Sequence, residues 1–517
     1  MKTNLKFWLR RISGLILCII IFSGIAQAEP KKVVTVSLNS TIQSINMLEF
    51  KTAGDLVVNF TFNSGLMGYF DLKTHQRSLG LAKSVKILKN PRDIKITLRD
   101  NLKFHSGDPV TAHDVKFTVE EVQNPANTNI MATTFLEIDE VEVVDDHTVI
   151  YHFAEPFAAW QEVMWMGICS KKYMERVGEK KFRKHPIGVG PFKFVDRKVD
   201  EVIIFEPDRN NPEYNINFDR LEYRLVKDPV TRIAMLETGE LDLIYGIAPH
   251  QIKGLETNKN ITVKKSSRVP SYFYLAIKPS LFPVIKDRNV RLAMNYAINR
   301  QEIIDRLYIK EGYPLYIFAN VGELGFDSRI KYEYNPKKAA NLLKNSSYEP
   351  GTPIRLSYTG MVPNGSQLAS TVQHYLKEIG MTVELIELEW GTWITYSTSR
   401  DEKTAKKAGH MGIGVFPTHD PHIRMALSMR TGGPLCYYCN RQNQTKVDDL
   451  VEKQLQEMDI KKRISILKNI HKINFNDPGQ VPLFGLNMIY AMSKRIDYEW
   501  NSSQMYLAQV EAIKLLE

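Results

Sequence analysis

Two hydrophobic periodicities alternate along this chain, and their alternation constrains the fold more than any other feature of the sequence. Apolar residues at every second position predict half-buried strands, and they occur at Ile94, Ile96 and Leu98, at Val149, Tyr151 and Phe153, and at Leu221, Tyr223 and Leu225. Apolar residues at helical spacing run from Val290 to Leu307, from Val447 to Met458 and from Ile466 to Ile473. Strands and helices mixed over 517 residues predict an α/β or α+β architecture with more than one hydrophobic core.

The composition is that of an ordinary globular protein. Hydrophobic residues make up 43% and charged residues 24% of the chain, which excludes a disordered, collagen-like or small disulfide-rich protein. The net charge is +10, but four basic residues lie within the first 28 positions, which leaves 64 basic against 58 acidic residues beyond them. This excess of basic residues is weak, and the chain has no dense Lys/Arg run of the kind that neutralises phosphates. We therefore expect no nucleic-acid partner.

The N-terminal residues have the layout of a cleaved secretory signal. Lys2, Lys6, Arg10 and Arg11 precede an apolar run over residues 15–22, and small residues follow up to the Ala-Gln-Ala sequence at 26–28. The alternative, a membrane anchor, is disfavoured because the strongly apolar run is well short of the ~20 residues that span a bilayer. Cys18 does not fit a lipoprotein site because a large residue, Leu17, precedes it. We therefore predict a signal peptide over 1–28 and export of the mature chain.

Export makes the remaining cysteines interpretable. Cys169, Cys436 and Cys439 remain in the mature chain, and an oxidising compartment favours pairing. The Cys-x-x-Cys spacing of Cys436 and Cys439 fits a redox pair, half of a zinc site or a short structural disulfide. A second such motif, a nearby histidine pair or a compact βαβ context is not evident. We favour a local disulfide, with Cys169 as a buried free thiol.

Sequence signatures of catalysis are absent. The chain has no Walker A motif, no His-Glu-x-x-His, no Gly-x-Ser-x-Gly and no strand-linked Gly-x-Gly-x-x-Gly. The glycine-rich sequence at 188–191 ends in a proline, which removes a backbone donor, so it predicts a turn rather than a phosphate site. Thr111 is predicted to cap a helix whose first turn holds Asp114. His105 and His113 are then expected to be structural or surface residues, with metal ligation as the alternative.

Several motifs occur in the order known from one protein family. Residues 98–115 (LRDNLKFHSGDPVTAHDV) resemble the signature of family 5 extracellular solute-binding proteins, the peptide and nickel receptors of ABC importers. The resemblance continues, in chain order, at 63–66 (NSGL), 186–192 (PIGVGPF), 237–242 (ETGELD), 290–300 (VRLAMNYAINR), 334–336 (YNP) and 420–422 (DPH). It therefore covers the chain from about residue 60 to about residue 425.

This resemblance implies a fold and a division into lobes. The implied fold is an α/β, two-lobed periplasmic binding protein-like fold of class II (cluster C), with an extra subdomain in the first lobe. Lobe I is placed at 29–275 and completed by 481–517, with 61–195 as its subdomain, and lobe II at 276–480. Residues 272–277 and 481–483 are expected to belong to the strands that connect the lobes. Closure about these strands is expected to convert ligand binding into a shape that a permease recognises.

The resemblance also implies which residues contact the ligand. Segments that line the cleft in relatives contain aromatic residues here, and aromatic surface gives peptides a large, sequence-tolerant contact area. The predicted ligand-binding residues are Phe50, Lys51, Trp160, Trp165, Trp390, Trp393, Phe416, His419 and Asp420. Packing in the hydrophobic core is the competing explanation for each residue taken singly.

Ligand identity depends on the segment around Asp420. Peptide-binding relatives place an aspartate that receives the peptide's ammonium group just before this motif, where this chain has Pro417. Asp420 is expected to cap a helix that begins with Pro421. In nickel-binding relatives a similar Asp-Pro-His is followed by Met-Arg, here Met429 and Arg430.

A metal site is the alternative within the same family. His410, His419 and His422 are its candidate ligands, since imidazole suits nickel. Nickel-binding relatives also use an arginine to hold a chelate's carboxylates, but the corresponding segment, 160–168, contains no arginine. Nickel-binding relatives also place a tryptophan near Val415 and a tyrosine near His419, and both of these aromatic residues are replaced here.

We therefore expect a periplasmic substrate-binding protein of an ABC importer that captures dipeptides or oligopeptides and delivers them to inner-membrane permease subunits. It is expected to act as a monomer, without a cofactor and without catalysis. The alternative within the family is a receptor for nickel or a nickel chelate. The alternative from another class is an exported hydrolase that uses carboxylates or the histidines.

Overall fold

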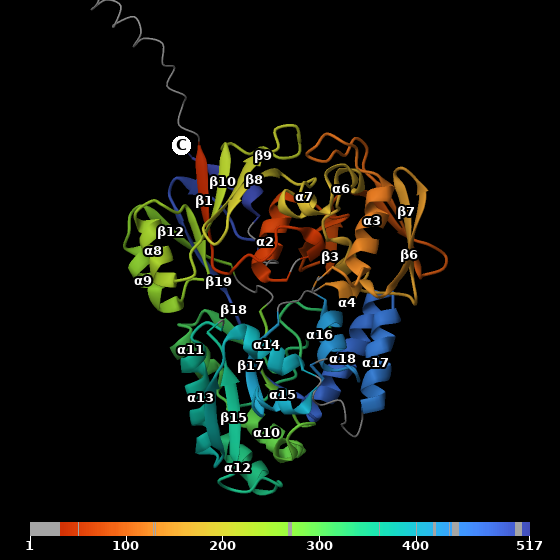
Figure 1. Ribbon diagram of the computed structural model, residues 1–517. Coiled ribbons are helices and arrows are strands. Elements are labelled where there is room, and N and C mark those ends of the chain that lie inside the picture. Colours follow the sequence, from red (N-terminus) through yellow and green to blue (C-terminus); the bar gives the residue numbers. More distant parts are fainter. Residues whose placement is uncertain are drawn as a thin grey trace, which may run out of the picture.

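The structure, a computed structural model, describes residues 32–49, 51–127, 129, 131–266, 271–360, 362–399, 401–416, 420–433, 435–436, 444–501 and 509–516. The predicted signal peptide lies outside these residues. Two large sheets organise the molecule into two parts, one above the other in Figure 1. We call the part built on a seven-stranded and a four-stranded sheet lobe I, and the part built on a six-stranded sheet lobe II.

The seven-stranded sheet of lobe I joins segments from both ends of the chain in the order β12-β19-β11-β1-β10-β9-β8. Its strands are β1 (Val33–Leu38), β8 (Phe192–Lys198), β9 (Val202–Pro207), β10 (Arg220–Leu225), β11 (Leu243–Tyr245), β12 (Ile261–Ser266) and β19 (Met488–Ser493). Strand β1 pairs in parallel with β10 and β11, and the other pairs are antiparallel. The predicted alternation in β10 is confirmed, because Leu221 and Tyr223 are fully buried.

A four-stranded antiparallel sheet forms the outer part of lobe I, in the order β4-β5-β7-β6. Its strands are β4 (Ala82–Ile87), β5 (Asp93–Leu98), β6 (Ile138–Asp145) and β7 (Thr148–Phe153), and the short β2 (Met67–Asp71) and β3 (Gln76–Leu79) form a hairpin nearby. The predicted strands at 94–98 and 149–153 are confirmed. Their alternating apolar residues pack in one cluster with α3 (Ala112–Gln123).

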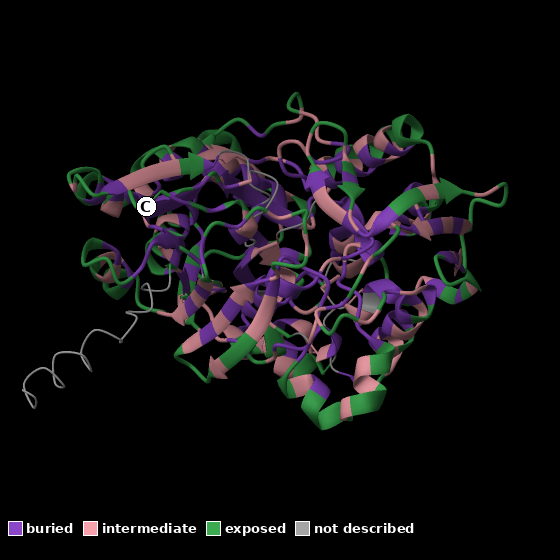
Figure 2. Cartoon of the chain, turned by 90° about the horizontal axis from the view of Figure 1, so that it is seen from above, coloured by how far each residue is buried: buried purple, intermediate pink, exposed green. Residues whose placement is uncertain are grey.

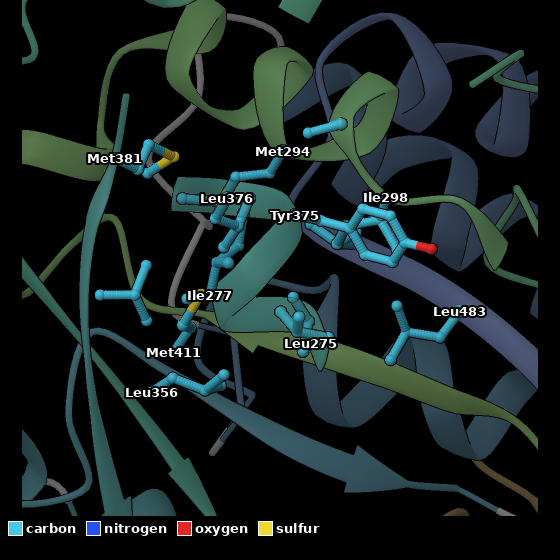
Figure 3. Close-up of a cluster of buried hydrophobic side chains, with 14 of the residues drawn as sticks. Leu275, Ile277, Met294, Ile298, Leu356, Tyr375, Leu376, Met381, Met411 and Leu483 are labelled. Atoms are coloured by element: carbon cyan, nitrogen blue, oxygen red, sulfur yellow. The ribbon is translucent and has the colours of Figure 1, made fainter. Parts of the chain in front are cut away.

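The sheet of lobe II has the order β14-β18-β13-β17-β15-β16. Its strands are β13 (Phe273–Ile277), β14 (Gly312–Pro314), β15 (Pro353–Tyr358), β16 (Thr382–Glu387), β17 (Met411–Val415) and β18 (Gln480–Leu486). Figure 3 shows one face of this sheet, where Leu275, Ile277 and Leu356 pack against side chains of the covering helices, among them Met294 and Leu376. Figure 2 shows the buried residues concentrated inside the molecule and the exposed ones at its periphery.

Two segments of the chain connect the lobes. Strand β12 belongs to the sheet of lobe I and β13 to that of lobe II, while β18 belongs to lobe II and β19 to lobe I. A single residue, Asn487, separates β18 from β19. The expected connecting segments at 272–277 and 481–483 thus lie largely in β13 and β18, and the exact lobe boundaries stay a prediction.

The helices surround the sheets of both lobes. In lobe I they are α2 (Ala53–Phe62), α3, α4 (Ala132–Phe135), α5 (Gln161–Met164), α6 (Lys171–Val177), α7 (Glu179–Lys184), α8 (Pro229–Glu237) and α9 (Ile252–Glu256). In lobe II they are α10 (Arg288–Ala297), α11 (Arg300–Leu307), α12 (Pro336–Lys344), α13 (Gly365–Glu378), α14 (Trp390–Thr398), α15 (Glu402–Lys406), α16 (Pro421–Ser428), α17 (Gln444–Gln456) and α18 (Ile460–Asn476). Within the described ranges, no helix has the length and apolar character required to cross a membrane.

One helical prediction requires a correction. The continuous helical pattern from Val290 to Leu307 forms two helices, α10 and α11, rather than one. The break occurs because Ile298 is extended and the Asn299 side chain accepts a hydrogen bond from the Glu302 N–H, which starts a new helix. Apolar spacing continues across the break because both helices pack on the same core.

The local structural predictions for the first lobe are confirmed. The Thr111 N–H and hydroxyl both donate to the Asp114 carboxylate at the start of α3, each at 2.9 Å. His105 holds the predicted turn: its Nδ1 accepts from the Gly188 N–H, and its Nε2 lies 3.0 Å from the Gly190 carbonyl oxygen. A Cβ at Gly188 would overlap the Phe62 carbonyl, which explains the glycine.

The described cysteines also agree with expectation. Cys169 is a free, buried thiol, and burial raises its pKa to about 12. Cys436 is disulfide-bonded, and Cys439, its expected partner, lies outside the described residues.

Candidate functional site

A cavity of about 150 Å3 lies where the two lobes meet. Lobe I contributes the β2–β3 hairpin and the chain around the start of α5, and lobe II contributes the N-cap of α16 and the turn between α17 and α18 (Figure 1). The lining residues are Phe70, His75, Gln76, Ile87, Ala158, Ala159, Trp160, Gln161, Glu162, Leu324, Asp420, Glu457, Met458, Ile460 and Arg463. Both lobes are needed to enclose this space, so separating them would open it.

A buried ion pair fixes the lobe I side of this interlobe cavity. Glu162, in α5, receives hydrogen bonds from Nε and Nη2 of Arg77 at 3.3 and 3.1 Å. The Arg77 guanidinium also lies over the Trp165 ring, 4.7 Å from its centroid, and Trp165 stacks on Phe60 at 4.6 Å. These contacts join the hairpin, α5 and α2, and so position the neighbouring Trp160 at the cavity wall.

A second buried ion pair fixes the lobe II side. Asp420 caps α16 by accepting a hydrogen bond from the His422 N–H at 2.8 Å, and Pro421 is the first residue of the helix. Arg463, at the start of α18, donates to both carboxylate oxygens of Asp420 at 2.6 and 2.7 Å. Burial alone would raise the pKa of Asp420, but the Arg463 guanidinium outweighs it and the pKa is lowered. The predicted cap is therefore confirmed.

The two lobes also touch directly beside the cavity. The Ala158 N–H donates to the Leu455 carbonyl at 2.6 Å. The Leu455 side chain, from α17 of lobe II, is 4% exposed because it packs into the hydrophobic cluster of lobe I. Phe157 meets the buried His422 ring edge to face, with centroids 5.3 Å apart. These contacts join the two lobes beside the cavity.

The predicted ligand-binding residues lie in several places. Trp160 and Asp420 line the interlobe cavity. Trp390 stacks on Trp393 at 5.4 Å, and Trp393 lines a second cavity, inside lobe II. Phe416 packs against a core cluster of lobe II, Trp165 stacks as described above, and Lys51 is exposed. Phe50 and His419 lie outside the described residues.

The candidate metal ligands lie in different environments. His410 stacks on Phe282 at 3.9 Å, and its Nδ1 accepts from the Arg355 N–H. His422 is buried between the lobes, and burial lowers its pKa to about 4. Within the described part of the chain, no three His, Cys, Asp or Glu side chains are grouped to hold a metal ion. His419 lies outside that part.

Sequence reasoning missed most of the polar residues of the cavity, among them His75, Glu457 and Arg463. His75 lies at the turn of the β2–β3 hairpin, Glu457 lies just after α17, and Arg463 lies in the first turns of α18. The only sequence signal is for Arg463, a charged residue within the apolar periodicity of α18. Burial lowers the pKa of His75, so its imidazole is neutral near pH 7.

Comparisons with known proteins give the family and the fold of this chain. The family model of bacterial extracellular solute-binding proteins, family 5, matches residues 77–430. A glutathione-binding protein GsiB from Pectobacterium atrosepticum is 28% identical over 369 residues, 69% of each chain. Among solved structures, the fold is similar to that of DppA from Helicobacter pylori in complex with the peptide STSA, with a TM-score of 0.78, 22% identity and coverage of 94% of this chain and 99% of that one.

A second solved structure, NikZ from Campylobacter jejuni in complex with Ni(L-His), gives a TM-score of 0.79 at 22% identity, with coverage of 94% of this chain and 99% of that one. These likenesses establish the two-lobed fold of periplasmic binding proteins. The family model covers well over half of the sequence. The chain therefore belongs to the family 5 extracellular solute-binding proteins, the substrate-binding components of ABC transporters.

Proposed function

We propose that this protein captures short peptides in the interlobe cavity and delivers them, chemically unchanged, to an ABC permease. The observation that carries the proposal is that one cavity is lined from both lobes, by Trp160 and Glu162 of lobe I and by Glu457 and Met458 of lobe II. A ligand held there gains contacts with the second lobe only on closure. Such differential contacts are what a ligand needs to drive a conformational change.

The character of the lining favours a peptide. Phe70, Trp160 and Met458 offer aromatic and thioether surface, which accepts side chains of varied shape. Carboxylates and a neutral imidazole stand among them and suit the polar groups of a peptide. The relatives give further support, since one is described as glutathione-binding and another was solved with a tetrapeptide.

The family assignment supports a role as a transporter component rather than as an enzyme. The partner is then a membrane permease, and the place of action is the periplasm, reached by cleavage of the signal predicted at 1–28. A monomer suffices for this role because the cavity is completed within one chain.

Thermal unfolding of the mature protein with defined ligand mixtures tests the proposal. A ligand at about 100 times its dissociation constant stabilises the native state by about 2.7 kcal/mol. We therefore expect a pool of di- to tetrapeptides to raise the melting temperature by several degrees, and nickel with histidine to leave it unchanged. Stabilisation by nickel with histidine alone, or cleavage of the bound peptides, would contradict the proposal.

A further inference from the structure

The interlobe cavity contains three carboxylates, and two of them are neutralised by arginines. Glu162 is paired with Arg77, and the two side chains are 7% and 3% exposed. Asp420 is paired with Arg463, and these side chains are 9% and 4% exposed. Each pair has two hydrogen bonds and stays within one lobe, so neither carboxylate offers its charge to a ligand.

The third carboxylate, Glu457, is in a different situation. It lies in the turn that joins α17 to α18, and its Oε1 accepts a hydrogen bond from the Asp459 N–H at 2.9 Å. Among the described residues Glu457 has no ion-pair partner. Apart from the two ion pairs, the only other titratable side chain among the described lining residues is His75, on the β2–β3 hairpin of lobe I.

His75 does not balance this charge. Burial lowers the pKa of its imidazole, and its Nδ1 is buried without a hydrogen-bond partner among the described residues. With Arg77 paired to Glu162 and Arg463 paired to Asp420, Glu457 on lobe II is the carboxylate of the described lining that no cation balances. A half-buried carboxylate that loses water on closure is stabilised by a positive group from the ligand.

We infer that Glu457 determines ligand charge: it binds a cationic group of the ligand, such as a free ammonium, when the lobes close. This inference rests on the proposed function and adds the charge class of the ligand to it. It selects ligands with an uncompensated positive end over acylated or anionic analogues.

Isothermal titration of the mature protein with trialanine and with N-acetyl-trialanine tests the inference. We expect acetylation to weaken binding to the wild type about 10-fold or more, as expected when a charged partner is removed. Glu457→Gln should weaken trialanine binding by a similar factor and abolish the difference between the two peptides. Glu378→Gln, on the lobe II helix α13 and outside the cavity lining, is the control and should behave as wild type.

The outcomes separate this inference from the proposed function. If Glu457→Gln keeps the wild-type discrimination between trialanine and its acetylated form, the inference is wrong while peptide binding stands. If no peptide binds, but arginine or cadaverine binds in a Glu457-dependent manner, the inference stands and the proposed function fails. Binding of glutathione or nickel with histidine alone, unaffected by Glu457→Gln, would contradict the inference.

Discussion

Replacing Arg463 with alanine is expected to lower the free energy of unfolding by about 3–5 kcal/mol at pH 7. The substitution leaves the buried Asp420 carboxylate without the guanidinium that donates to both of its oxygens. It also removes hydrogen bonds to Gln454 in α17. Chemical denaturation of the mature protein measures the loss. A loss below about 1 kcal/mol, the value typical of surface ion pairs, would contradict this account.

The pH dependence of this variant has a defined sign. In the wild type the pKa of Asp420 is lowered, so its contribution to stability is present above the carboxyl's usual pKa and is lost as the pH falls through the lowered value. In the variant the same carboxyl is buried without its cation, and its pKa moves upward. The difference between the two proteins should therefore shrink below about pH 5.

Two controls isolate the buried charge as the cause. Asp420→Asn combined with Arg463→Ala removes the stranded charge and keeps a side-chain oxygen to cap α16, so part of the stability should return. Lys406→Ala breaks an exposed pair with Glu402, whose side chains are 42% and 65% exposed. It should cost less than about 1 kcal/mol.

Replacing Leu455 with alanine is expected to weaken peptide binding about 30-fold. Leu455 belongs to a helix of lobe II but is buried in the hydrophobic cluster of lobe I. Truncating a buried leucine costs at least about 2 kcal/mol. Here the substitution destabilises the closed form relative to the open form, because residue 455 is exposed in the open form of both the wild type and the variant. The apparent affinity falls with the population of the closed form. Isothermal titration with trialanine measures it.

Leu467→Ala is the matched control for this prediction. Leu467 is fully buried in α18, in a cluster of lobe II residues only, so its truncation should lower the stability of the fold with little effect on affinity. Equal affinity losses in the two variants would show that Leu455 has no special role in closure. An unchanged affinity in Leu455→Ala would show that the contact with lobe I is not part of the ligand-bound state.

Local patterns in the sequence were sufficient to predict much of the fold. The strands at Ile94–Leu98 and Val149–Phe153 alternate because one face of each is buried, and this signal lies within a few residues. The break between α10 and α11 was missed because the apolar spacing crosses it, although Asn299 provides a cap signal. Assignment of the strands to two sheets, with β1 beside β10 and β19 beside β11, requires long-range pairing that no local pattern encodes.

The cavity was predictable only in part. Trp160 and Asp420 were singled out through the family resemblance, and both line the interlobe cavity, whereas their contact with a ligand stays a prediction. Arg463 was missed because its partner Asp420 lies 43 residues away. Glu457 was missed because a glutamate after a helix is ordinary on a surface, and only the meeting of the two lobes makes it part of a cavity.

Native mass spectrometry of the mature protein after incubation with trialanine tests the central claim most directly. The account predicts a complex of one chain with one peptide, from which the intact tripeptide is released on activation. It also predicts that the complex is much reduced for the Leu455→Ala variant. The absence of a complex at peptide concentrations that saturate other receptors, or the release of a shortened peptide, would contradict the account.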